Sequence, residues 1–178
     1  MVGIFFARVK EEGDPMTALN RGYFVCLGLA VIGLFIAVQV MLHSMWFFWA
    51  GLVGILGSVA FVFVTQYYTE VKYRPVKEIA KASRTGPAVN IVAGVAVGFE
   101  TTFSSAVVIG MALLGSFWLG SQATLADGTV MPHAGIFGTA VATMGMLMTA
   151  AYILAMDTFG PITDNANGII EMSGAGQS

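Results

Sequence analysis

The sequence predicts an all-α integral membrane protein with four transmembrane helices and the end of a fifth. Its 178 residues are 57% hydrophobic and only 10% charged, whereas soluble domains carry roughly 25% charged residues. Four apolar segments, at about 22–42, 46–68, 87–119 and 134–157, reach the ~20 residues that a helix needs to cross a bilayer. Helices are expected because an open sheet would leave its backbone polar groups unsatisfied in lipid.

Two features accompany the first two spans: an apolar segment ahead of the first, and a regular row of glycines in the second. Ahead of the first, residues 1–7 are apolar but too short for a signal peptide, with no basic region before them. We interpret them as the end of a further span that begins outside this chain. In the second span, glycines recur every three residues, which predicts a helix face lined by Gly51, Gly54 and Gly57.

The third span, 87–119, is longer than a simple crossing and is polar in its middle. Glu100 lies about ten residues inside it, and a lone carboxylate at that depth normally faces a polar interior or a partner. Glu100 is therefore either a hydrogen-bonded group that holds helices together or a point on an ion path. Gly94 and Gly98 form a GxxxG pair, which permits close helix approach.

Charge predicts the orientation of the spans. The eight basic residues lie in two stretches: Arg8, Lys10 and Arg21, then Lys72, Arg74, Lys77, Lys81 and Arg84. The positive-inside rule then makes segments 8–21 and 69–86 cytoplasmic, and the fourth span returns 160–178 to the same side. A net charge of −2 gives no case for nucleic acid.

The basic residues of the second stretch have different expected roles. Lys72 and Arg74 are expected to face lipid phosphates or to set topology. Arg84 adjoins the start of the third span, with Asn90 just beyond it, and either faces solvent or turns inward toward a ligand.

The fourth span runs directly into an acidic segment. Asp157, Asp164 and Glu171 follow one another at intervals of seven residues, so on a helix they share one face, about 10 Å apart. One metal ion cannot bridge that separation, but a row of ions or a polyanion–metal complex can. The alternative is a solvated helix end with ordinary surface acids.

Three blocks together resemble the membrane-bound, ion-translocating pyrophosphatases. The first runs from Tyr67 to Val76, the second from Ala82 to Gly98, and the third from Asp157 to Gly174. The third is similar to the family pattern of aspartate, aromatic, Gly-Pro, Asp-Asn-Ala-Gly-Gly and Glu-Met. The order and spacing of all three blocks also agree with the family.

The resemblance implies a sixteen-helix, homodimeric pump that hydrolyses pyrophosphate with Mg²⁺ and moves H⁺ or Na⁺ across a lipid bilayer. K⁺ is an activator in potassium-dependent members. The bilayer is a prokaryotic plasma membrane or the membrane of an acidic organelle. The chain would correspond to helices seven to eleven, about a quarter of such a protein, as expected for a fragment or a truncated gene product.

The resemblance also assigns residues. Asp164 matches an aspartate that binds the magnesium–pyrophosphate complex, and Asp157 matches the acid one heptad earlier. Asn165 and Glu171 match pattern positions without an assigned role. The other acidic metal-binding helices of the family lie outside this chain, so no catalytic set is complete and the isolated chain is expected to be inactive.

The chain departs from the family pattern at several positions. Asn167 replaces a glycine, Ile170 a small residue and Val89 a threonine, and Phe103-Ser104-Ser105 stands where Ala-Leu-Pro is usual. Two alternatives are a stand-alone four-helix membrane protein that binds or conducts an ion without catalysis, and a structural subunit that pairs with separate chains.

Overall fold

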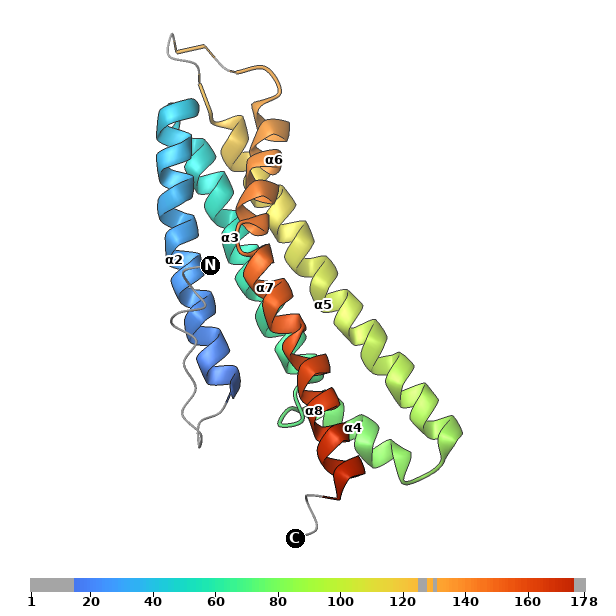
Figure 1. The fold of residues 1–178 in the computed structure, drawn as a ribbon. Coiled ribbons are helices and arrows are strands. Elements are labelled where there is room, and N and C mark those ends of the chain that lie inside the picture. The colour runs from blue at the N-terminus through green and yellow to red at the C-terminus, as the bar shows by residue number, and fades with distance from the viewer. Residues whose placement is uncertain (1–14, 125–127, 130, 175–178) are drawn as a thin grey trace. The chain divides into compact units, whose positions relative to one another are not determined.

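The computed structural model describes residues 15–124, 128–129 and 131–174. The main elements in these residues are helices, which confirms the predicted all-α class. They are α2 (Pro15–Met41), α3 (Met45–Thr69), α4 (Arg74–Ser83), α5 (Pro87–Ser121), α6 (Ala134–Leu147), α7 (Ala150–Asp157) and α8 (Phe159–Ser173) (Figure 1). The expected end of a further span, at residues 1–7, lies outside the described residues.

Three helical segments are long and apolar enough to cross a membrane: α2, the stretch Met45–Ser83 that contains α3 and α4, and α5. A fourth crossing is present if α6 and the helix that follows it form one broken span. The helix over the first predicted span starts earlier than expected, at Pro15, where the fixed φ of proline suits a first helical turn.

The expectation of one continuous helix over 134–157 is wrong. Helix α6 ends at Leu147 and α7 begins at Ala150. The carbonyl oxygen of Thr149 accepts hydrogen bonds from the backbone N–H groups of Tyr152 (3.0 Å) and Ile153 (3.1 Å), so a new helix starts there. No glycine or proline stands at the break. Neither helix-breaking residues nor hydropathy therefore indicated it.

The chain divides into two compact units, residues 1–33 with 147–178, and residues 34–146. In the first unit, α7 packs against the early part of α2. The Tyr152 hydroxyl donates to the carbonyl oxygen of Leu19 at 3.0 Å, and the Tyr152 and Tyr23 ring centroids are 6.4 Å apart. Tyr23 is only 1% exposed and Tyr152 is also buried, so this contact lies in the interior of the unit.

In the second unit, α6 lies against the predicted glycine face of α3. A Cβ atom added at Gly54 would lie 2.6 Å from the carbonyl carbon of Ala142 and would overlap its oxygen. A Cβ at Gly145 would likewise overlap the carbonyl oxygen of Gly51. Backbone therefore touches backbone, with no side-chain layer between the two helices.

A second pair of glycines brings α6 close to α5. A Cβ at Gly120 would lie 2.7 Å from Gly138 Cα, and the reverse distance is also 2.7 Å. The GxxxG pair Gly94 and Gly98 behaves differently. An added Cβ at either position meets no atom within 4 Å among the residues that the structure describes, so the pair brings no described helix close.

Candidate functional site

The acidic row lies on α7 and α8. Asp157 ends α7, and Asp164 and Glu171 are on α8. Between the helices, Thr158 keeps a helical conformation (φ −73°, ψ −15°), and the N–H of Ile162 donates to its carbonyl oxygen at 3.4 Å. Pro161 interrupts the hydrogen-bond ladder because it has no N–H. The three acids therefore lie on two consecutive helices joined through a helical residue, and their common face stays a prediction from the heptad spacing.

The three acids of the row are all exposed, and α8 buries none of its residues. Within the described ranges, no three His, Cys, Asp or Glu residues come close enough together to hold a metal ion. A hard cation such as Mg²⁺ takes about six oxygen ligands. Asp164 can supply one carboxylate, so the rest of a coordination shell has to come from substrate, water or other segments.

Glu100 has a cationic partner in the second unit. The Arg74 guanidinium at the start of α4 lies 2.7 Å from Glu100 Oε1 on α5 and 3.3 Å from Glu78 Oε1. Of the two earlier interpretations, the structure supports a paired carboxylate that holds two helices together. The hydrogen bond with Tyr67 and the charge of Glu100 both raise the pKa of Arg74, so the guanidinium stays charged.

Lys72 and Arg74 each have a carboxylate partner, but both side chains remain more than half exposed, so their expected role in facing lipid phosphates or setting topology stays a prediction. Lys72 Nζ lies 2.5 Å from Glu70 Oε2. Arg74 and Glu100 are 26 residues apart in sequence, and only the packing of α4 on α5 joins them. Charge counting detects the basic stretch but not this fold-back.

Hydroxyl and aromatic groups adjoin the residues of the ion pair, with Tyr67 beside Arg74 and Ser104 beside Glu100. The hydroxyls of Tyr68 on α3 and Ser104 on α5 lie 3.1 Å apart, and the Tyr67 and Tyr73 ring centroids are 5.4 Å apart. We call the set Tyr67, Tyr68, Arg74, Glu100 and Ser104 the α4 junction. Sequence reasoning missed Tyr68 and Ser104, although Ser104 lies one turn from Glu100 and so on its face of α5.

Asn90 and Arg84 lie at the other end of α4. The Ser83 hydroxyl donates to Asn90 Oδ1 at 3.0 Å, which links the end of α4 to the first turn of α5. Gly86 makes the turn between them with φ +133°, a conformation that favours glycine. Arg84 is exposed and has no ion-pair partner in the described part of the chain.

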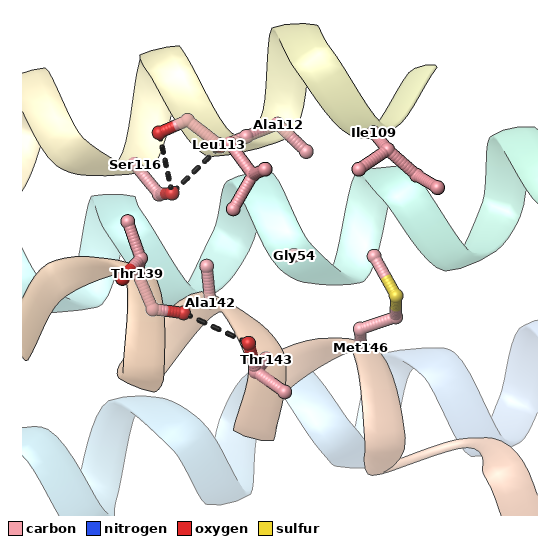
Figure 2. Close-up of a pocket in the computed structure, with 9 residues that line it drawn as sticks. All are labelled: Gly54, Ile109, Ala112, Leu113, Ser116, Thr139, Ala142, Thr143 and Met146. Carbon is pink, nitrogen blue, oxygen red and sulfur yellow. Dashed lines mark hydrogen bonds between the residues drawn. The ribbon is translucent and has the colours of Figure 1, made fainter. Parts of the chain in front are cut away.

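A cavity of about 260 Å³ lies among α3, α5 and α6 (Figure 2). Ser116, Thr139 and Thr143 line it, and their hydroxyls donate to backbone carbonyl oxygens of their own helices. The other lining residues are glycine, aliphatic residues and methionine, and none of the described lining residues is titratable.

Removing the Arg74–Glu100 pair is expected to loosen α4 from α5. We expect a coupling energy of about 1 kcal/mol, the upper end for pairs whose side chains are partly exposed. The measurement is a double-mutant cycle of Arg74→Gln and Glu100→Gln on the thermal unfolding of the full-length protein. A cycle of Lys72→Gln with Glu100→Gln is the control, because Lys72 pairs with Glu70 instead. Equal coupling in the two cycles would show that the Arg74 contact is not specific.

Comparison with known proteins identifies relatives along the whole chain. A family model described as "Inorganic H+ pyrophosphatase" matches residues 1–178. The chain is 57% identical to "K(+)-insensitive pyrophosphate-energized proton pump 2" of Moorella thermoacetica, over 98% of this chain and 26% of that protein. It is 49% identical to "Pyrophosphate-energized membrane proton pump 3" of Arabidopsis thaliana, over 90% of this chain and 21% of that protein.

A third relative is the "K(+)-insensitive pyrophosphate-energized proton pump" of Caldanaerobacter subterraneus, which is 52% identical over 98% of this chain and 26% of that protein. The chain thus spans about a quarter of the length of these curated relatives. No solved structure matches it.

Proposed function

The chain belongs to the inorganic H⁺ pyrophosphatase family, and from this premise we propose that the full-length protein hydrolyses pyrophosphate to two phosphates and couples this reaction to proton movement across a membrane. The observation that carries the proposal is the family match over every residue of the chain. The match also favours a pump over a stand-alone four-helix ion-binding protein, because the chain aligns with one part of much longer pumps.

Asp164 is the residue of this chain that we assign to the magnesium–pyrophosphate complex. Its carboxylate is a hard oxygen donor of the kind that Mg²⁺ prefers, and it is exposed on α8. Bound Mg²⁺ would neutralise the charge that develops as the phosphoanhydride breaks and would help to activate water. Asp157 and Glu171, one heptad to either side, would support Asp164 through their negative charge.

Two other candidate residues, Glu100 and Asn90, receive positioning roles. Glu100 and its partner Arg74 fix α4 against α5, and Asn90 ties the end of α4 to the same helix. We do not place Glu100 on the ion path, because its carboxylate is committed to a guanidinium.

The finer features of the pump are also proposals. Two relatives are named as K⁺-insensitive, so we propose that activity does not require potassium, and that the transported ion is H⁺ rather than Na⁺. The protein would act as a homodimer in a prokaryotic plasma membrane. Three of these features have a direct measurement: activity without K⁺, transport without Na⁺, and the mass of the purified complex for the homodimer.

The function is tested with the full-length protein in sealed vesicles. Pyrophosphate and Mg²⁺ together are expected to acidify the vesicle lumen, and chelation of Mg²⁺ should abolish both phosphate release and acidification. The isolated 178 residues should release no phosphate, because one carboxylate does not complete a magnesium site. Hydrolysis by the full-length protein without a proton gradient would contradict the coupling, and phosphate release by the isolated chain would contradict the assignment of the site.

A further inference from the structure

Helix α4 has two chemically different faces. Pro75 is buried, and Val76, Ile79 and Ala82 are partly buried, so this side packs against the rest of the unit. The opposite side carries three exposed cations, Lys77, Lys81 and Arg84. At 3.6 residues per turn, these three lie within an arc of about 60°, centred roughly opposite the packed side.

No described carboxylate neutralises these three cations. Glu70 pairs with Lys72, and Glu78 and Glu100 both pair with Arg74. Lys77, Lys81 and Arg84 have no ion pair within the part of the chain that the structure describes. The basic stretch therefore divides into two cations that pair with carboxylates of the same unit and three exposed cations that do not. We call the three exposed cations the basic face of α4.

The neighbours of α4 along the chain indicate where its basic face lies relative to a membrane. Figure 1 shows α4 joining the end of α3 to the beginning of α5, and both neighbours are long and apolar enough to span a membrane. A ten-residue helix that connects the ends of two spans is expected on the side of the membrane at which those spans end. Long lysine and arginine side chains extend toward phosphates from such a position.

We propose that Lys77, Lys81 and Arg84 form a docking face for the headgroups of anionic lipids in the adjacent leaflet. A phosphate group is the chemistry that such cations recognise, and free phosphate or pyrophosphate is a second source of it. The lipid surface fits better because the three side chains are spread along an exposed helix face. They do not converge on one point, as the donors around a single small anion do.

The test uses the full-length protein in nanodiscs that contain either phosphatidylcholine alone or phosphatidylcholine with phosphatidylglycerol. Native mass spectrometry counts the phosphatidylglycerol molecules that stay bound after release from the disc. The neutralised variant is K77Q/K81Q/R84Q, and the charge-conserving control is K77R/K81R/R84K. Each lost cation is expected to weaken anionic lipid retention roughly fivefold at low salt. The control should keep the wild-type preference.

The outcomes separate lipid from a soluble anion. Loss of phosphatidylglycerol retention in the neutralised variant, with an unchanged melting temperature in phosphatidylcholine discs, supports the proposal. Retention equal to that of the wild type overturns it. A raised KM for pyrophosphate in that case would assign the face to the soluble anion. If the neutralised variant does not fold, K77Q/K81Q is measured in the same way, and unchanged retention again overturns the proposal.

Discussion

Replacing Asp164 by asparagine in the full-length protein is expected to lower Mg²⁺-dependent pyrophosphate hydrolysis by a factor of about 100 or more. The amide keeps the size of the side chain but removes the negative charge that a hard cation requires. Loss of an electrostatic contact to the reacting group typically costs about 10²–10³ in kcat. Phosphate release over a range of Mg²⁺ concentrations is the measurement, and more Mg²⁺ should be needed for half-maximal activity.

Two variants on α8 control for indirect effects of this change. Asp164→Glu keeps the carboxylate and should retain part of the activity at raised Mg²⁺. Met172→Leu is a volume-conserving substitution on the same helix and should leave kcat within a factor of about two, because such swaps disturb packing little. Wild-type kcat and Mg²⁺ dependence in Asp164→Asn would remove this residue from the metal–substrate site.

Replacing Gly54 by alanine is expected to destabilise the protein by about 3 kcal/mol, the upper end of the usual range for overpacking. The new Cβ would overlap the backbone of Ala142, and no rotamer change can move a backbone carbonyl. Gly145→Ala should have a similar effect, since its Cβ would overlap the carbonyl oxygen of Gly51. Thermal unfolding of the full-length protein in detergent measures both effects.

Gly57→Ala is the matched control for the glycine contact. Gly57 lies one turn from Gly54 on α3, but its added Cβ would meet side-chain atoms alone, the methyl carbon of Met146 at 3.1 Å and the Cβ of Ala112 at an ordinary 3.9 Å. A methionine side chain can move by a few tenths of an ångström at little cost, so this variant should melt close to the wild type. An equal loss of stability in Gly54→Ala and Gly57→Ala would mean that α6 does not approach α3 at backbone distance.

Helices α3 and α5 were predictable because hydropathy and length decide which segments span a bilayer. The second and third predicted spans, 46–68 and 87–119, closely match Met45–Thr69 and Pro87–Ser121. The glycine face of α3 was also predictable, because period-three spacing determines which residues share a helix face. The break after Leu147 was not, since hydropathy reports burial in lipid and carries no information on a local change in hydrogen bonding.

The candidate site divides in the same way. The common face of Asp157, Asp164 and Glu171 follows from helical geometry, whereas the role of Asp164 rests on family resemblance and remains a proposal. The Arg74–Glu100 pair could not be predicted from either residue alone, since it depends on the direction in which α4 folds back on α5. Such a contact requires the three-dimensional arrangement, and periodicity does not specify it.

The contact between α3 and α6 also limits how these helices can move. Where side chains separate two helices, rotamer changes let one helix slide or rotate past the other. At Gly54 and Gly145 the facing backbones leave no such adjustable layer. The adjoining segments of α3 and α6 are therefore expected to move as one rigid body in any rearrangement of the neighbouring helices.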